Sequence, residues 1–492
     1  MISIFTSDSS QFKFDVLVEV AREALNNDLS EEKANAMAKQ LVSLGGERFR
    51  CCVYKEREVL RQRVRLAMGK MANDSEEYKP KQIVQVIEAA CDGCTIQKIQ
   101  VTDNCRKCMK KACMAACNFG AISMGAHRSE IDPSKCKECG ACARACPYNA
   151  IVVTERPCFA SCPVQAISWN EANIAQIDED RCINCGACLK ACPFGAISDM
   201  SWVSQVIKML KSGVEAYAIV APSIQGQFEN VPLPQIMKAV EMLGFTKCLE
   251  VASGADAVAY YEAEELVKHK ETGLPMTTSC CPGFVNMLKI HFPEQYEKNK
   301  STTVTPMMAT ARKLKLEHPG CKVAFVGPCV AKKQEAMQEV SAVDYVLTYE
   351  EVSAMMIAKG IDVDEVEAVE DLTASNYGRN FAYSGGVAAA VVEALKESGY
   401  DKPVTTVLAN GGKECKQQLN LIKFGKFNAD ILEGMACPGG CIAGPGVISQ
   451  PLMVKGRMAK ENVPNKARTI TESLQSTDYS NVDMNVNHKI DL

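Results

Sequence analysis

The first ninety residues carry apolar side chains at the spacing of a helix. In this stretch the recurring apolar positions are Phe14, Val16, Leu17, Val20, Ala21 and Leu25. Their periodicity predicts an amphipathic helix. A second helix is predicted from about Tyr54 to Met68, which is rich in Arg, Glu and Leu, and Asp74–Lys81 is a candidate polar linker. We therefore interpret residues 1–90 as a helical N-terminal segment.

Residues 201–450 alternate between two patterns. Short apolar runs predict strands at 216–221, 322–326 and 405–408, and amphipathic stretches predict helices at 233–243 and 387–398. Strands that alternate with helices imply parallel sheets with helices on their faces. Ligands of such folds bind beyond the carboxyl ends of the strands. Residues 451–492 are polar and are interpreted as a C-terminal tail, whose last dozen residues are expected to be poorly ordered.

Cysteines dominate the stretch between these two parts. Sixteen of them fall between Cys91 and Cys192, and the clearest run is Cys182-x2-Cys185-x2-Cys188-x3-Cys192 followed by proline. In such a run three thiolates bind irons of one 4Fe–4S cluster, and the fourth binds a neighbouring cluster. Ala-Ile steps end four copies of the pattern, at 121–122, 150–151, 166–167 and 196–197. Residues 91–200 are therefore predicted to form two ferredoxin-like units with four 4Fe–4S clusters.

The exchange of the fourth cysteine assigns the ligands of one unit. One cluster takes Cys105, Cys108, Cys113 and Cys146, and its partner takes Cys117, Cys136, Cys139 and Cys142.

The second unit is interrupted in the sequence. The Cys182 run has no adjacent partner run, but Cys91-x2-Cys94 matches the first half of a motif and Cys158-x3-Cys162 the second half. We infer that the first unit is inserted into the second. The clusters of the second unit then take Cys91, Cys94, Cys158 and Cys192, and Cys162, Cys182, Cys185 and Cys188. The alternative is a zinc site at Cys91 and Cys94 with two further cysteines.

Length, composition and charge narrow the class of protein. A chain of 492 residues suggests about three domains, and 47% hydrophobic residues are typical of a globular protein. A formal net charge of -4 argues against nucleic-acid binding. The 26 cysteines follow no signal peptide, so we expect a reducing, cytoplasmic setting. No apolar run approaches 18 residues, so no membrane span is expected.

Three loops in the second half carry further cysteines. They span residues 278–284 (TSCCPGF), 327–335 (GPCVAKKQE) and 433–441 (EGMACPGGC). With Cys280 set aside, four cysteines remain, and four thiolates suit one more cubane: Cys281, Cys329, Cys437 and Cys441. Glu262 and Glu265 are three residues apart and share a helix face, where they are candidate acid–base groups or a solvated face.

The three loops resemble the signature motifs of the iron-only (FeFe) hydrogenases. The resemblance covers about residues 210–450, and the upstream units resemble the accessory domain of that family. It implies an α/β catalytic domain of two lobes with small parallel sheets, preceded by α+β ferredoxin-like 4Fe–4S domains. It also implies an H-cluster, in which a 4Fe–4S cubane shares a cysteine with a diiron unit that carries carbonyl, cyanide and dithiolate ligands.

The resemblance also implies roles for single residues. Cys281, Cys329, Cys437 and Cys441 would hold the cubane, and Cys441 would bridge to the diiron unit. Lys332 would donate to one cyanide, Ser223 to the other, and Met435 would pack against the diiron unit. Cys280 would be the first proton-relay group, with Glu262 and Glu265 behind it, and Glu335 would support the second motif from behind.

Four positions depart from the family pattern. Gly327 stands where a methionine is common, Met307 where a glutamine is common, and Phe284 where a tryptophan is common. The serine of the usual proton path is expected to be displaced, with Lys300 and Ser301 in that region. These changes indicate a divergent subgroup.

The resemblance implies an enzyme that interconverts dihydrogen with protons and electrons. Ferredoxin would be the electron partner, and dedicated maturation enzymes would build the diiron unit. A basic cluster is a candidate docking site for ferredoxin or a solvated face: Arg106, Lys107, Lys110 and Lys111. Two alternatives remain, a hydrogen-sensing protein of the same fold and a non-catalytic iron–sulfur assembly protein of the hydrogenase-like family. The joint presence of Cys280, Lys332 and Glu335 favours the enzyme.

Overall fold

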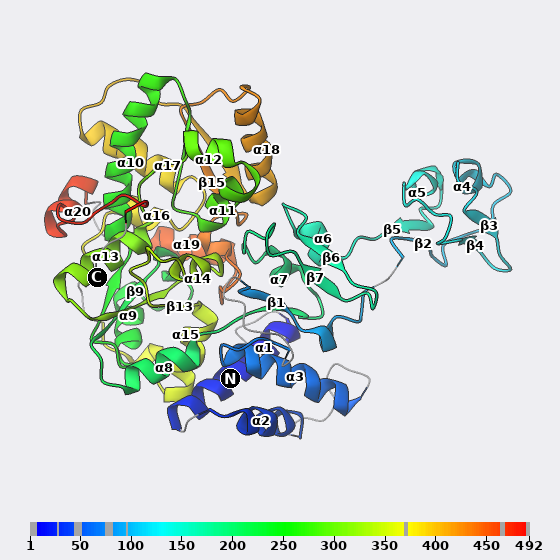
Figure 1. Ribbon diagram of the computed structural model, residues 1–492, viewed down its shortest axis with the longest axis horizontal. Coiled ribbons are helices and arrows are strands. Elements are labelled where there is room, and N and C mark those ends of the chain that lie inside the picture. The colour runs from blue at the N-terminus through cyan, green and yellow to red at the C-terminus, as the bar shows by residue number, and fades with distance from the viewer. Residues whose placement is uncertain are drawn as a thin grey trace.

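The computed structural model describes residues 7–26, 29–43, 52–73, 82–94, 97–368, 372–462 and 468–488 (Figure 1). The predicted linker at 74–81 lies outside these residues. The N-terminal part consists of α1 (Asp8–Asn26), α2 (Glu31–Ser43) and α3 (Val53–Ala67). The apolar face of α1 is buried, as its periodicity predicted, and it packs on α15 (Tyr349–Lys359) of the second half. The three helices are thus fixed to the body of the molecule.

An outer ferredoxin-like unit, residues 82–94 and 156–200, follows the helices. Its elements are β1 (Val84–Val86), η1 (Glu88–Ala90), α6 (Pro157–Ser161), β6 (Ile167–Trp169), β7 (Ala175–Ile177), α7 (Ala187–Ala191) and β8 (Ile197–Asp199). Strand β1 pairs antiparallel with β8, and β6 with β7. Because β1 precedes residue 90, the unit begins earlier than the expected boundary between the helical segment and the cluster region.

An inner unit, residues 97–155, interrupts the outer one. Its elements are β2 (Ile99–Val101), α4 (Ala112–Ala115), β3 (Ile122–Met124), β4 (Ser129–Ile131), α5 (Ala141–Ala145) and β5 (Ile151–Val153). Strands β2 and β5 pair antiparallel, and the Thr154 amide donates to the Lys98 carbonyl at 2.7 Å. The points at which the chain enters and leaves the inner unit therefore lie side by side. In Figure 1 this unit stands away from the rest of the molecule, joined to it through that paired neck.

Two parallel sheets form the frame of the second half. One has the strand order β10-β9-β12-β13, with β9 (Ala216–Val220), β10 (Lys247–Glu250), β12 (Lys322–Val326) and β13 (Tyr345–Leu347). The other has the order β11-β15-β14, with β11 (Met276–Thr277), β14 (Thr406–Asn410) and β15 (Ile431–Met435). The small parallel sheets expected from the alternating pattern are thus present, and their central strands are buried.

Helices cover these sheets. They are α8 (Val203–Lys211), α9 (Leu233–Glu241), α10 (Ala252–Thr272), α11 (Pro282–His291), α12 (Pro293–Asn299), α13 (Pro306–Glu317), α14 (Ala331–Ala336), α15, α16 (Asn376–Asn380), α17 (Gly386–Glu397) and α18 (Gly412–Lys423). Short 3-10 turns are η2 (Pro222–Ile224), η3 (Val363–Glu365) and η4 (Cys441–Ala443). One continuous apolar core joins α10, α13 and α17 to strands of both sheets.

The C-terminal segment differs from the expected polar tail. It contains α19 (Pro451–Asn462) and α20 (Ile470–Ser476), and residues beyond α20 also pack on the body. Tyr479, Val482 and Met484 are buried, and the Arg312 guanidinium donates to the Asp483 carbonyl at 2.6 Å. Residues 481–488 are therefore ordered, because scattered apolar side chains and backbone carbonyls of this polar stretch find partners on α13.

Candidate functional site

The three cysteine-bearing loops meet at one cavity of about 80 Å³. The loop after β9 and the loop after β12 come from one sheet, and the loops after β11 and β15 come from the other. All are loops at the carboxyl ends of parallel strands, where such folds bind ligands. The residues that line the cavity include the four proposed cubane ligands, Cys280, Ser223, Lys332, Met307 and Met435.

The four proposed ligands also interact electrostatically. Burial, then the neighbouring Cys281, raises the pKa of the Cys329 thiol to about 12. Burial raises the pKa of Cys441 still further, with contributions from Cys329 and Cys281. Burial and the same two neighbours raise the pKa of the Cys437 thiol well above its ordinary value. Thiols so buried and so close together become thiolates only when positive charge compensates them, which is what iron ions supply.

Polar donors in the cavity fit an anionic iron centre. Lys332 Nζ lies 2.7 Å from Glu335 Oε2, yet this ion pair lacks hydrogen-bond geometry, and both atoms are buried without a completed hydrogen bond. The other Glu335 oxygen accepts from Thr305 Oγ1 at 2.5 Å. Glu335 therefore holds the lysine, while the N–H groups of Lys332 remain able to donate into the cavity. Soft thiolates together with a buried ammonium suit an iron–sulfur centre with anionic ligands.

Ser223 reaches the same cavity from the turn η2. Its hydroxyl lies 2.6 Å from the hydroxyl of Tyr349 at the start of α15, and both side chains are fully buried. The sequence motifs did not single out Tyr349.

The residues that depart from the family pattern have local explanations. A Cβ at Gly327 would lie 2.4 Å from the Phe325 ring, so the ring occupies the space of a larger side chain. A Cβ at Gly434 would likewise meet Phe284, which is fully buried. Phe325 and Met307 both line the cavity. Relative to the residues expected from the family pattern, this wall of the cavity is therefore lined by apolar side chains such as Phe325 and Met307.

Polar side chains behind Cys280 lie between the cavity and the surface. Glu262 Oε1 accepts from the backbone amide and the hydroxyl of Ser279, both at 3.0 Å, directly beside Cys280. Burial raises the pKa of Glu262 to about 7, and that of Cys280 well above its ordinary value. A carboxyl group with a pKa near neutrality can both give and take a proton.

Ser301 connects the two proposed relay carboxylates. Its hydroxyl donates to Glu265 Oε2 at 2.7 Å and also lowers the pKa of Glu262 slightly. Glu265 is half-buried, so it can exchange with solvent. Ser301, which was expected in the region of the usual proton path, thus lies near both carboxylates. Lys300 Nζ donates to the carbonyl of Ser301 at 2.6 Å, which holds this backbone segment.

The thiols of the outer unit gather in the two groups inferred from nesting. Burial raises the pKa of Cys158 to about 11, with further contributions from Cys192, Cys94 and Cys91. Burial also raises the pKa of Cys185 to about 12, with contributions from Cys182, Cys162 and Cys281. Cys188 interacts with Cys185, Cys182 and Cys162, and also with Cys158 of the other group. The group of Cys185 is thus the one that borders the cavity, through Cys281.

The repeated Ala-Ile steps have a common structural cause. The backbone amides of Ala121, Ala150, Ala166 and Ala196 donate to the sulfur four residues earlier, at 3.3–3.4 Å. The residue before each alanine has a positive φ: Gly120, Asn149, Gln165 and Gly195. N–H groups aimed at sulfur stabilise a thiolate cluster ligand. The Cys158–Cys162 half therefore has the same local geometry as the three other halves.

The inner unit shows the same grouping. The pKa of Cys142 is raised by burial and by Cys136 and Cys117, and the sulfurs of Cys105 and Cys113 both lie 3.8 Å from Ser129 Oγ. Among the described residues, no three Cys, His, Asp or Glu side chains converge tightly enough for a single metal ion.

Gly283 lies at a contact between the outer unit and the cysteine-bearing loops. A Cβ at this position would lie 3.0 Å from Ala436 Cβ and 3.5 Å from Cys185 Cβ. The first loop, which carries Cys281, therefore packs directly on the loop of Cys185.

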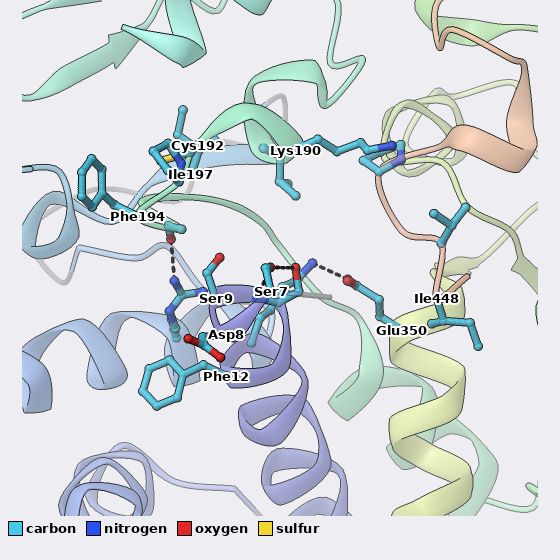
Figure 2. A pocket seen from close by; sticks show the side chains of 18 of the residues that line it. Ser7, Asp8, Ser9, Phe12, Lys190, Cys192, Phe194, Ile197, Glu350 and Ile448 are labelled. Carbon is cyan, nitrogen blue, oxygen red and sulfur yellow. Dashed lines mark hydrogen bonds and ion pairs between the residues drawn. The ribbon is translucent and has the colours of Figure 1, made fainter. Parts of the chain in front are cut away.

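A larger cavity of about 720 Å³ lies away from these loops, between the start of α1, the end of α7 and Ile448 (Figure 2). Cys192 is on its wall. Its cations contact protein acceptors: Lys13 binds Glu350, Arg63 donates to the Gly195 carbonyl, and Lys190 donates to the Ala443 carbonyl. The cavity is therefore a gap where three parts of the chain pack together.

Comparison with known families agrees with the geometry. Residues 214–445 match the family described as iron only hydrogenase large subunit, C-terminal domain, and residues 129–152 and 175–198 match 4Fe-4S binding domains. This chain is an iron-only hydrogenase-like protein. The resemblance predicted from the three loops is thereby confirmed.

Relatives of this hydrogenase-like protein include enzymes and an assembly factor. The periplasmic [Fe] hydrogenase large subunit of Nitratidesulfovibrio vulgaris is 29% identical over 384 residues, which cover 66% of this chain and 87% of that protein. Iron hydrogenase 1 of Clostridium pasteurianum is 29% identical over 43% of this chain and 45% of its own length. A probable cytosolic Fe-S cluster assembly factor of Anopheles gambiae is 25% identical over 42% of this chain and 54% of that protein.

A solved FeFe hydrogenase of Chlamydomonas reinhardtii is 20% identical, covers 56% of this chain and 92% of that chain, and has a TM-score of 0.47. In the described part of this hydrogenase-like protein, no helix combines the length and the apolar character needed to cross a membrane.

Proposed function

We propose that this chain catalyses the reversible interconversion of dihydrogen with protons and electrons. The observation that carries the proposal is the meeting of Cys281, Cys329, Cys437 and Cys441 with Cys280 and Lys332 at one buried cavity. The four cysteines would hold the cubane of an H-cluster, with Cys441 as the bridge. The diiron unit of that cofactor would supply the low-valent metal at which dihydrogen is split or formed.

Each neighbouring residue then has a defined task. Lys332, held by Glu335, would donate to one anionic ligand, Ser223 would donate to another, and Met435 would exclude water. Protons would pass between Cys280 and solvent through Glu262, Ser301 and Glu265: Ser279, beside Cys280, donates to Glu262, and Ser301, which influences Glu262, donates to Glu265. Electrons would leave through the Cys185 group, because Cys281 borders it.

Four accessory 4Fe–4S clusters would continue the electron path. The outer unit would hold one pair and the inner unit the other, with the sixteen ligands inferred above. A reducing, cytoplasmic setting would suit these thiolates and is part of the proposal.

Ferredoxin is the proposed electron partner, and the inner unit offers it a surface. Residues 97–155 hold nine Lys and Arg against five Asp and Glu, a formal charge of +4 in a chain whose total is -4. Arg106, Lys107, Lys110 and Lys111 are exposed, and Met109 between them is 98% exposed. A basic rim around an apolar side chain suits an acidic carrier, and steering by charge weakens as salt rises. A transfer rate that does not depend on salt would contradict docking at this surface.

The decisive experiment is infrared spectroscopy of protein matured by co-expressed maturation enzymes, followed by assay with reduced ferredoxin. We expect carbonyl and cyanide bands and evolution of dihydrogen. Cys280→Ala should abolish turnover but keep the bands, whereas Cys248→Ala, a change at a buried cysteine outside the three loops, should keep both. Full turnover in Cys280→Ala would contradict the relay role.

The Anopheles relative supports a second candidate, a non-catalytic iron–sulfur assembly protein. Such a protein would show iron and sulfide but no carbonyl or cyanide bands after the same maturation, and would pass a cluster to an acceptor protein. The infrared spectrum therefore separates the two functions before any assay of turnover.

A further inference from the structure

The contact between Ser223 and Tyr349 lies just behind the cavity wall. Ser223 lines the cavity, and Tyr349 is not among the lining residues. Their hydroxyl oxygens are 2.6 Å apart, and the Tyr349 hydroxyl lies 3.5 Å from the Ala221 carbonyl. Both side chains are fully buried, so water does not compete for this hydrogen bond.

The turn that carries Tyr349 is held on several sides. Thr348 and Glu351 form a capping box at the start of α15, and the Tyr349 amide donates to the Gly446 carbonyl at 3.1 Å. Glu350 accepts from Lys13 at 2.6 Å, and Glu351 accepts from Lys333 at 2.8 Å. The position of the tyrosine ring is therefore fixed by α1, α14 and the loop after η4.

Either hydroxyl can donate at this distance, and the arrangement that matters for the cavity is the one in which the phenol donates to Ser223 Oγ. When the phenol donates to Ser223 Oγ, the serine proton is free for another acceptor. A hydroxyl that accepts a hydrogen bond also becomes a stronger donor itself. The acceptor within reach of Ser223 is whatever occupies the cavity.

We propose that Tyr349 is a positioning residue that orients the Ser223 hydroxyl into the cavity, toward an anionic ligand of the iron centre. The inference rests on the proposed function, in which that ligand is a cyanide. It adds a residue from outside the three cysteine loops to the groups that set the electronic state of the centre.

Infrared spectroscopy of matured protein tests the proposal. Ser223→Ala should shift one cyanide band, and Tyr349→Phe should shift the same band in the same direction. The double variant should show no shift beyond that of Ser223→Ala, because the tyrosine acts through the serine. Tyr345→Phe is the matched control, since Tyr345 lies on neighbouring β13 and packs edge-on against Trp202.

A fluorinated tyrosine at position 349 keeps the ring and the hydroxyl but makes the phenol a stronger donor. It should move the band opposite to Tyr349→Phe, so the proposal stays testable if the phenylalanine variant does not fold. Absence of carbonyl and cyanide bands in the unmodified protein would reject the proposed function. Bands that are present but unmoved by Tyr349→Phe, or shifts that add in the double variant, would reject the role of Tyr349 alone.

Discussion

Opposing effects act on the buried carboxyl group of Glu262, the proposed relay residue. It is fully buried on α10, yet it accepts two hydrogen bonds from Ser279, which favour its charged form. Burial opposes this and raises its pKa to about 7, with a further contribution from Glu265. Desolvation therefore outweighs the two hydrogen bonds, and the group stands near the point where both forms are populated.

Glu262→Gln should change the pH dependence of stability. Folding raises the pKa of this carboxyl from 4.5 to about 7, so the native state binds more protons between these values and stability falls as pH rises through them. The variant lacks this loss. The difference in free energy of unfolding between the variant and the wild type should therefore be more favourable to the variant at pH 8 than at pH 4, by up to about 3 kcal/mol. Urea unfolding at the two pH values measures it.

The control for that experiment is Glu264→Gln, on the exposed face of the same helix, which should show no such difference. An equal effect of Glu262→Gln at both pH values would contradict the raised pKa.

Ser301→Ala should interrupt the line of proton transfer without disturbing the cavity. The variant removes the hydroxyl that donates to Glu265 at 2.7 Å and stands beside Glu262. Turnover with a reduced dye should fall by about 10²–10⁴-fold, the usual contribution of one proton-transfer group. Ser301→Thr keeps a hydroxyl and should retain most activity, and Ser398→Ala should be silent. Unchanged turnover in Ser301→Ala would show that protons take another route.

The sequence predicted residues within motifs better than contacts between segments. The loops of Cys281, Cys329 and Cys437 could be recognised because each is a short contiguous pattern. Ser301 meets Glu265 across 36 residues, and Tyr349 meets Ser223 across 126. Neither spacing leaves a periodic or local signal, so only the folded chain reveals these partners.

At the scale of elements, a buried charge network joins four parts of the chain. Lys333 of α14 contacts Asp199 of β8 at 2.7 Å and Glu351 of α15 at 2.8 Å, and Lys13 of α1 contacts Asp199 and Glu350. Lys333 follows Lys332 directly, so the network fixes the short helix that carries the proposed cyanide donor. It also explains why α1 packs on the second half.

Lys333→Met should destabilise the protein strongly. Removal of the cation leaves Asp199 and Glu351 buried with their charges only partly compensated, which costs about 3–5 kcal/mol. The midpoint of urea unfolding should fall accordingly. Lys298→Met removes an exposed pair with Glu294 and should change stability by less than about 1 kcal/mol. A similar small effect for Lys333→Met would show that the network does not support the fold.

Periodicity predicted several elements closely and failed at the C-terminal end. The predicted helix at 54–68 corresponds to α3, and the predicted strand at 216–221 corresponds to β9. Residues 479–488 carry few apolar side chains at irregular spacing, so hydrophobic pattern alone could not show that they pack on α13. Their order comes from long-range backbone contacts.

At the scale of the whole molecule, groups of cysteines form a line from the inner unit to the cavity. The inner unit stands apart and the outer unit packs on the body (Figure 1). Cys185 interacts electrostatically with Cys281 of the cavity. Nesting explains this arrangement, because an insertion whose ends are paired can extend from its host without distorting it. The sequence predicted the nesting from motif halves but not the direction in which the inner unit projects.

Deletion of the inner unit should leave the rest of the molecule folded. Residues 99–153 can be replaced by a two-residue turn, since Lys98 and Thr154 are already hydrogen-bonded. After reconstitution the variant should hold about eight fewer iron atoms, those of two cubanes. It should retain turnover with a small dye and lose transfer with ferredoxin. Loss of iron from the outer unit as well would contradict the nested arrangement.

The contact at Gly283 has a consequence for the rate of electron transfer in the proposed function. With no side chain at this position, little more than one layer of atoms separates the Cys185 loop from the Cys281 loop. Electron tunnelling falls off steeply with the thickness of the insulating layer. If electrons leave the proposed cluster by this route, the bare backbone of Gly283 keeps the path between the two loops short.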